Sequence, residues 1–195
     1  IGSLDRELRG DVTVREHLKS FAPWIAFAAG SAMGDWRSGV AAGLVVLAQQ
    51  RRGPGVELLT AVTTAFFAVF LPIALASPDA GVRPYLAALA LGTLGVAATA
   101  SLLVGKPFTV ALARRSTPPE LWDDPLFLRV NTVITAVWAA SFTVTALVGA
   151  VLAHEHSHAV PLWVVAQVVG FVVPVSFTRT YPARVRGRLL GPTAD

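Results

Sequence analysis

Long apolar runs separated by short polar stretches are the dominant pattern along the chain. A helix needs roughly 20 apolar residues to cross a hydrocarbon layer about 30 Å thick. Four runs approach or exceed that length: Glu57–Ala76, Pro84–Val104, Leu126–Ala153 and Pro161–Phe177. The fourth run is shorter and contains a proline, but no charged residue interrupts it. The pattern predicts four membrane-spanning helices.

A less regular stretch, Phe21–Gln50, precedes these runs. It consists of two short apolar pieces on either side of the sequence GDWRSG. Both pieces are short for a full crossing, so they form either two short spans in a thinned bilayer or a re-entrant hairpin. Gly30 with Gly34, and Gly39 with Gly43, have the small-residue spacing that lets two helix backbones approach closely. Either arrangement returns the chain to the side from which it entered.

Two charges, Asp35 and Arg37, lie at the turn between these short pieces. In a re-entrant hairpin they would lie within the bilayer, where isolated charges are costly and usually functional. In two short spans they would lie in water. Gly34 and Gly39 bracket the charges as a turn would, which favours the position in water.

Composition supports a membrane protein. Only 14% of the 195 residues are charged and 54% are hydrophobic, whereas soluble domains carry about 25% charged residues. Of the 16 basic residues, all but Arg37 and Arg83 fall in loops on one side of a six-segment arrangement. Basic loops remain in the cytoplasm, which places both termini there. Arginines beside anionic lipids account for the net charge of +4, so the charge does not require nucleic acid as a partner.

The predicted fold is therefore an all-α polytopic integral membrane helical bundle. It has six membrane segments, of which the first two are short, and both termini are cytoplasmic. Residues 1–19 form a cytoplasmic N-terminal segment, 20–182 a single transmembrane domain, and 183–195 a basic cytoplasmic tail. A cytoplasmic connector, 105–125, lies between the fourth and fifth segments.

The connector has the sequence GKPFTVALARRSTPPELWDDP. Its proline-initiated stretch PFTVALARR predicts a short helix, and Thr117 and Glu120 have the spacing of a capping box. Asp124 followed by Pro125 predicts an N-cap and the first residue of the next span. We expect the short helices of the connector to lie at the membrane surface.

At that surface, Phe108, Leu112 and Trp122 would enter the headgroup region. The basic side chains of Lys106, Arg114 and Arg115 would meet lipid phosphates. Binding of a partner protein by Lys106, Arg114, Arg115 and Trp122 is the alternative. Trp24, Trp36, Tyr85, Trp163 and Tyr181 fall near span ends, which predicts interfacial anchors.

Two sets of residues are candidates for chemistry within or beside the membrane. His154, His156 and His158 in the sequence HEHSH carry imidazoles that suit zinc or copper, and the pattern H-E-x-x-H matches that of zinc proteases. A short external loop does not supply the helix, cleft and third ligand that such a site needs, so we expect a solvated loop without metal or cofactor. Asn131, Thr135, Trp138 and Phe142 share one helical face; we expect interhelical packing there, with a ligand-facing stripe as the alternative.

The order of several features resembles the intracellular septation protein A family of small bacterial inner-membrane proteins. These features are the early FAPWIAF, the short first hairpin, Lys106–Pro107 after a later span, and RVNTVITAVWAASF with Asn131 near its start. The likeness extends from about Phe21 to Pro182. It implies a bacterial cytoplasmic membrane location, and a role in envelope maintenance and division through contacts with other membrane proteins. It supplies no catalytic residues.

We therefore expect a non-catalytic protein whose partners are the lipid bilayer and other membrane proteins or a second copy of itself. The sequence contains no cysteine, which excludes thiol chemistry. One alternative is a small-solute transporter or channel with three plus three helices, because Pro72 and Pro174 interrupt the last span of each half. A second alternative is a membrane-embedded enzyme acting on a lipid-like substrate.

Overall fold

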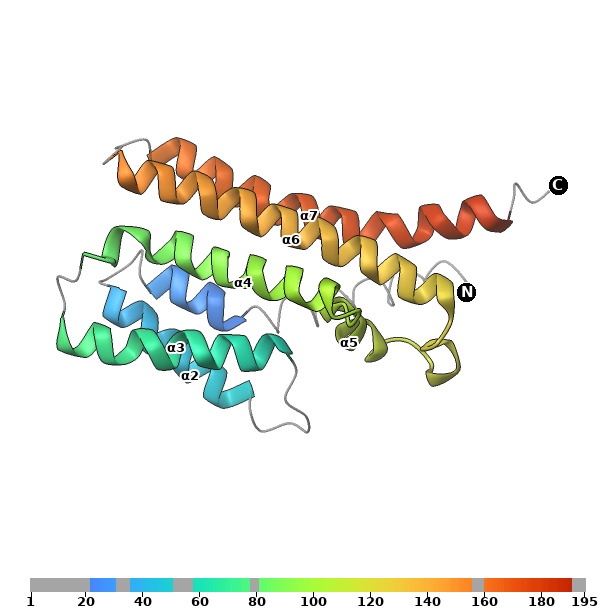
Figure 1. Ribbon diagram of the computed structural model, residues 1–195, viewed down its shortest axis with the longest axis horizontal. Helices are drawn as coiled ribbons and strands as arrows, with labels where there is room; N and C mark the ends of the chain where they lie inside the picture. Colours follow the sequence, from blue (N-terminus) through green and yellow to red (C-terminus); the bar gives the residue numbers. More distant parts are fainter. Residues whose placement is uncertain (1–21, 31–35, 51–57, 78–80, 156–159, 191–195) are drawn as a thin grey trace.

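The computed structural model describes residues 22–30, 36–50, 58–77, 81–155 and 160–190 (Figure 1). Within these ranges every regular element is helical, which confirms the all-α prediction. After a helical segment over residues 22–30, the elements are α2 (Trp36–Gln50), α3 (Leu58–Ala76), η1 (Arg83–Tyr85), α4 (Leu86–Leu103), α5 (Phe108–Arg114), η2 (Pro119–Leu121), α6 (Pro125–His154) and α7 (Val160–Leu190).

Four helices of the described part are long and apolar enough to cross a membrane. They coincide with the four predicted runs: Leu58–Ala76, Arg83–Leu103, Pro125–His154 and Pro161–Gly187. The last helix is the main difference, because α7 continues to Leu190 instead of ending near Phe177. Segment 22–30 and α2 are shorter, and whether they span or re-enter stays a prediction.

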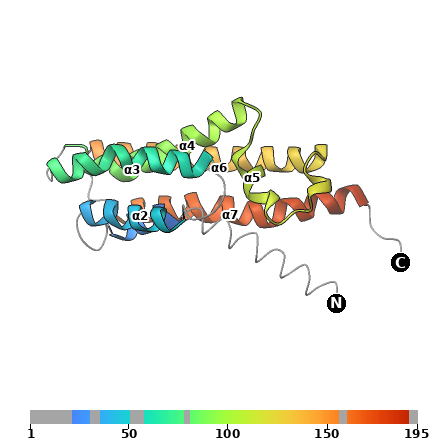
Figure 2. The same ribbon diagram turned by 90° about the horizontal axis from the view of Figure 1, so that it is seen from below.

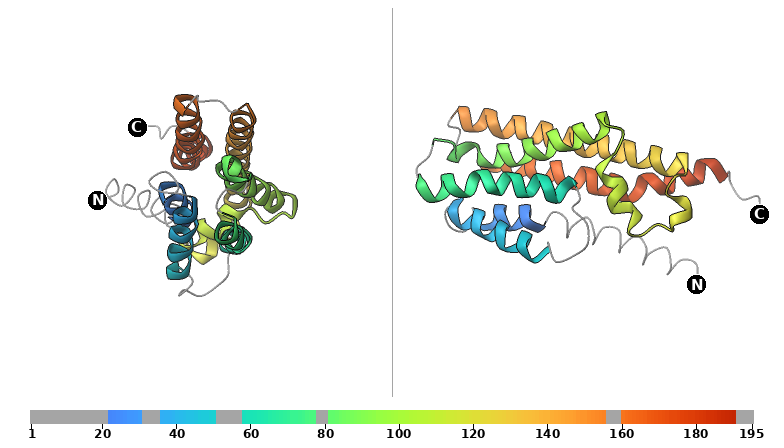
Figure 3. Two further views of the ribbon diagram at one scale, coloured as in Figure 1. Left: turned by 90° about the vertical axis from the view of Figure 1, so that its left-hand side faces the viewer. Right: turned by 60° about the horizontal axis from the view of Figure 1, so that its bottom comes forward.

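The helices are arranged as an open arc around the long axis. Helix α4 packs on α6, α6 on α7, α3 on α4, and α2 on α3. Seen end-on, the arc runs from α7 through α6, α4 and α3 to α2 and segment 22–30 (Figure 3, left). The starts of α3 and α6, the ends of α4 and α7, and helix α5 all lie at one end of the bundle (Figures 1 and 2). The side of a membrane that this end faces stays a prediction.

Segment 22–30 and α2 pack closely where the sequence placed a small-residue contact. A Cβ atom added to Gly30 would lie 2.8 Å from the Cα of Gly39, closer than real Cβ atoms approach. The two backbones therefore meet at these glycines, and the predicted close approach is confirmed for this pair. Gly43 instead accommodates the ring of Phe67 on α3, and Gly34 lies outside the described residues.

Helix α4 ends in a Schellman motif that explains the sequence GKP. Gly105 has a φ of 70°, a left-handed conformation that glycine adopts without steric cost. The Lys106 amide donates to the Ser101 carbonyl and the Gly105 amide to the Leu102 carbonyl, both at 2.9 Å, which is the pairing of that motif. Pro107 then sets the start of α5, so the chain turns sharply from α4 into the connector.

The start of α6 follows the sequence prediction, whereas the preceding turn does not. The Leu126 amide donates to Asp124 Oδ1 at 2.7 Å, and Pro125 is the first helical residue, as expected. The predicted capping box at Thr117 and Glu120 is wrong. The short helix η2 begins after Pro118 without a side-chain cap, and the carbonyl of Thr117 accepts a hydrogen bond from Trp122 Nε1 at 2.9 Å.

An aromatic cluster joins segment 22–30 to α3. Its rings lie with centroids 4.6–5.9 Å apart and belong to Trp24, Phe27, Phe66, Phe67 and Phe70. Trp24 is buried and its Nε1 donates to Thr63 Oγ1 at 2.9 Å. The prediction that Trp24 is an interfacial anchor is therefore wrong, because its indole packs into this cluster and finds its hydrogen-bond acceptor inside the bundle.

Candidate functional site

The predicted polar face of α6 lies inside the bundle. Asn131, Thr135, Trp138 and Phe142 are all buried. Thr109 of α5 donates to the Asn131 carbonyl at 2.9 Å and lies 2.7 Å from the hydroxyl of Thr135. The Asn131 amide nitrogen donates back to the Phe127 carbonyl of its own helix at 2.9 Å. Asn131 and Thr135 therefore attach α5 to α6.

The next residue of this face, Trp138, contacts α7. Its Nε1 donates to Thr178 Oγ1 at 3.1 Å, and Thr178 in turn donates to the Pro174 carbonyl at 2.7 Å. The ring of Trp138 packs edge-on against Phe171, with centroids 5.7 Å apart. At Asn131, Thr135 and Trp138 these contacts favour the packing interpretation over a ligand-facing stripe.

The buried polar side chains are hydrogen-bonded inside the bundle, many of them to their own helix. Each of the six buried polar side chains of the described part has a partner: Thr63, Ser101, Thr109, Asn131, Thr135 and Thr145. Eight threonines donate to the carbonyl four residues earlier in their own helix: Thr63, Thr64, Thr93, Thr99, Thr132, Thr145, Thr178 and Thr180. A threonine bonded in this way carries no unsatisfied donor into the apolar layer.

The connector is bound to the bundle more firmly than predicted. Phe108 and Leu112 are buried in the hydrophobic core, where they cannot enter a headgroup region, so that expectation is wrong. The reason is that the apolar face of α5 packs on α6. The Phe108 amide at the start of α5 also donates a hydrogen bond to Ser101 Oγ of α4 at 3.2 Å.

The polar side of the connector keeps a basic surface. Lys106 and Arg115 are exposed, and Arg114 and Trp122 are half-buried. The Arg114 guanidinium lies over the Trp122 ring, 5.0 Å from its centroid, in a cation–π contact. Arg114 Nε is buried without a hydrogen-bond partner in the part of the chain described. Arg114 and Trp122 thus stabilise each other, while Lys106 and Arg115 face outward.

The loop candidates lie largely outside the described residues. His154 and Glu155 are exposed at the end of α6, whereas His156 and His158 fall in 156–159 and Asp35 in 31–35. Arg37 is half-buried in the first turn of α2. Among the described residues, no three His, Asp or Glu side chains gather as metal ligands.

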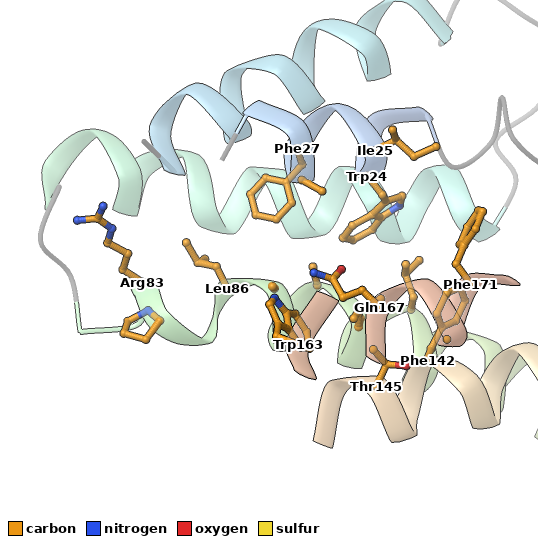
Figure 4. A pocket seen from close by; sticks show the side chains of 17 residues that line it. Trp24, Ile25, Phe27, Arg83, Leu86, Phe142, Thr145, Trp163, Gln167 and Phe171 are labelled. Carbon is orange, nitrogen blue, oxygen red and sulfur yellow. The ribbon is translucent and has the colours of Figure 1, made fainter. Parts of the chain in front are cut away.

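A cavity of about 450 Å³ lies between segment 22–30, α4, α6 and α7 (Figure 4). Aromatic and aliphatic side chains form most of its wall: Trp24, Phe27, Leu86, Leu91, Leu94, Phe142, Trp163 and Phe171. Its polar groups are few, with Gln167 projecting into the space and Arg83 at one end (Figure 4). A concave, mostly apolar space with a few polar groups is typical of a small-molecule site.

Two glycines determine how α7 sits beside this cavity. The Trp163 ring occupies the space that a side chain at Gly149 of α6 would fill, 2.6 Å from the position of such a Cβ. Gly170 of α7 gives the same close approach to Thr145 of α6. Helix α7 is therefore packed on α6, and the space toward α4 and segment 22–30 is left for the cavity.

Gln167 is not among the candidate site residues predicted from the sequence. Arg83 was counted only for orientation, and Trp24 and Trp163 were interpreted as anchors. A usable signal was present, because Gln167 is the one amide side chain in the apolar run from Pro161 to Phe177. It is half-buried and makes no hydrogen bond within the described part of the chain.

Comparison with protein families, curated proteins and solved structures finds no match for this chain. The resemblance to the septation protein A family therefore rests on the sequence features given above.

Proposed function

We propose that the chain is a non-catalytic protein of the bacterial cytoplasmic membrane that acts by binding other membrane proteins of the envelope. The observation that carries this proposal is that the polar side chains in the interior of the bundle are hydrogen-bonded within it. All six buried polar side chains of the described part are bonded within the bundle. The polar groups of this interior hold the helices together. We therefore expect partner binding to occur at the surfaces of the molecule.

Helix α7 provides one such surface. Only 6% of the residues in its apolar stretch are buried in the bundle, against 28–39% in the other three long helices. Val164, Val168 and Val172 are among its half-exposed residues. A helix with this much apolar surface is suited to lipid or to a helix of another membrane protein.

The connector provides a second surface of different character. Lys106 and Arg115 are exposed beside the Arg114–Trp122 pair. Arginine and tryptophan are enriched among the residues that dominate protein interfaces. A partner with an acidic segment would complement this charge.

The transporter alternative has less support from the described residues. Pro72 and Pro174 lie within α3 and α7 as the sequence implies, but neither lines the cavity. Asn131 and Thr135, the polar groups expected along a solute path, are hydrogen-bonded at the contact between α5 and α6.

Co-purification of partners from native membranes tests the proposal. Lys106→Glu with Arg115→Glu reverses two exposed charges of the connector and should reduce partner recovery about tenfold, since unlike charges become like charges. Arg184→Glu with Arg186→Glu makes the same change on exposed residues in the last turns of α7, outside the apolar surface described by Val164, Val168 and Val172, and should leave recovery unchanged.

Asn131→Leu should also retain the partners if the variant folds, because the Asn131 side chain is buried and, among the described residues, bonds only to its own helix. Two results would contradict the proposal. One is equal loss of partners from both charge-reversal variants. The other is solute flux in proteoliposomes that Asn131→Leu abolishes, which would favour a transporter.

A further inference from the structure

We propose that the cavity between segment 22–30 and α7 binds one anionic glycerophospholipid from the surrounding bilayer. The phosphate lies at Arg83, an ester carbonyl at Gln167, and an acyl chain along Trp24, Phe27 and Phe171. This lipid site does not depend on the protein-binding function proposed above.

The apolar part of the cavity suits an acyl chain. The volume of the whole cavity, about 450 Å³, lies within the range of roughly 300–1,000 Å³ that is usual for ligand sites. Ile25 and Ala28 line it from segment 22–30 and are themselves exposed, Ile25 by 49%. The cavity therefore reaches the surface of the bundle beside these residues. A bilayer around the long helices would meet that opening, so a chain can enter from the side.

Gln167 supplies a hydrogen-bond donor about two turns inside the end of the bundle at which α7 begins. It lies seven residues after Val160, the start of α7, which at 1.5 Å per residue is about 10 Å along the helix. Its amide points into the cavity (Figure 4) and has no hydrogen bond within the described part. An amide left unpaired in apolar surroundings is costly. The ester carbonyl of a glycerophospholipid, between headgroup and chains, is an acceptor of the right kind.

Arg83 favours a lipid whose headgroup carries a net negative charge. It is exposed at the end of the cavity where α4 begins (Figure 4). No carboxylate of the described residues forms an ion pair with it. A guanidinium pairs with phosphate through parallel hydrogen bonds, and a cation at a membrane surface favours lipids with net negative charge. A zwitterionic lipid would bring a second, positive group close to Arg83.

Photocrosslinking in bilayers tests the site directly. The full chain is reconstituted in phosphatidylcholine bilayers that contain a small fraction of phosphatidylglycerol with a diazirine on one acyl chain. After irradiation, labelled peptides are mapped by mass spectrometry. We expect labelling of segment 22–30 and of α7 around Phe171. The same diazirine chain on phosphatidylcholine should label these peptides about fivefold less.

Two pairs of variants separate the cavity from its surroundings. Ala87→Trp fills the cavity from α4 and should reduce labelling at least about threefold by displacing the chain, whereas Ala100→Trp on an exposed part of the same helix should not. Ala28→Trp, at the exposed rim, serves if Ala87→Trp fails to fold. Arg83→Gln should remove the preference for phosphatidylglycerol, and Arg37→Gln, which removes a charge that does not line the cavity, should preserve it.

Several outcomes would overturn the proposal. Equal labelling of Ala28→Trp and Ala100→Trp would mean that the cavity does not hold the chain. Equal labelling by the two headgroups in the unaltered protein, or a preference that survives Arg83→Gln, would remove the role of Arg83. Stronger labelling by a diazirine-bearing palmitate would indicate a free fatty acid in place of a phospholipid. Crosslinking of one protein copy to another through these peptides would indicate a dimer contact.

Discussion

Thr109 and Thr135 form the hydrogen bond that joins the connector to the long helix α6. The single hydroxyl proton of Thr109 is donated to the Asn131 carbonyl. Thr135 must therefore donate to Thr109 Oγ1 across the distance of 2.7 Å. Both side chains are almost fully buried, so water does not compete for the bond. At this scale the polar residues join helices through hydrogen bonds.

This arrangement predicts a measurable coupling between the two threonines. Thr109→Val and Thr135→Val should each lower the free energy of unfolding by about 1 kcal/mol. A double-mutant cycle should give a coupling of about 0.6 kcal/mol, the mean found for hydrogen bonds between membrane helices. Unfolding in mixed micelles with increasing dodecyl sulfate, followed by circular dichroism, provides the free energies.

Thr132→Val is the matched control for this cycle. Thr132 is exposed on the same helix and bonds to the Leu128 carbonyl of its own backbone, so its loss should change stability little. Strictly additive effects of Thr109→Val and Thr135→Val would show that the two hydroxyls do not interact.

Whole helices are held together by small residues at particular contacts. The Gly30–Gly39 contact is a backbone approach that no rotamer change can relieve. Gly92 on α4 is different, because a Cβ added there would lie 3.8 Å from the Cβ of Ala146, an ordinary contact distance. The two glycines should therefore respond oppositely to the same substitution.

Gly30→Ala should destabilise the protein by about 1–3 kcal/mol, because the added methyl group separates segment 22–30 from α2. Gly92→Ala should be neutral or stabilising by up to about 1 kcal/mol, since alanine is the better helix former. Thermal unfolding in one detergent, measured on both variants, distinguishes these signs. A tolerated Gly30→Ala would mean that the hairpin is not closely packed.

Elements were predictable from the sequence where the signal is local. The length of an apolar run sets the span, so the boundaries of α3 and α6 differ from prediction by one residue at most. Asp124 and Pro125 are adjacent, so the N-cap of α6 was also visible. The extension of α7 was not, because its last turns carry arginines and hydropathy does not detect a helix that continues beyond its apolar run.

Features that depend on contacts distant in sequence were mispredicted or missed. Phe108 and Leu112 read as an amphipathic surface helix, and the presence of α6 beside them decides their burial. The cavity is lined by both Trp24 and Gln167, although more than a hundred residues separate them in the sequence. The residue pattern within one helix does not predict which residues of distant helices line the same cavity.

At the scale of the whole molecule, the two ends of the bundle should face opposite sides of the membrane. Glu120 in η2, which follows α5, and Glu155 after α6 are both exposed. Helix α5 and the end of α6 lie at opposite ends of the bundle (Figure 1). Basic residues gather at the end that carries the connector, which should remain in the cytoplasm. The orientation predicted from charge is thus testable at two described glutamates.

Because the chain contains no cysteine, a single introduced cysteine is the only site that a maleimide can label. In intact bacterial cells, Glu155→Cys should react with a membrane-impermeant maleimide, whereas Glu120→Cys should react only after permeabilisation. Both proteins, denatured in detergent, should label equally, which controls for expression. Labelling of Glu120→Cys but not of Glu155→Cys in intact cells would show that the predicted orientation is wrong.

The threonines that donate to their own helix backbones have a consequence for biogenesis. Membrane helices enter the bilayer from the translocon before they pack together, and each must then tolerate hydrocarbon on its own. Thr132 and Thr180 are exposed and still hydrogen-bonded. Their hydroxyls impose no requirement for a neighbouring helix. Individual spans can therefore remain separate in the lipid while later ones are synthesised, and this applies most to α7, the least buried of the four long helices described.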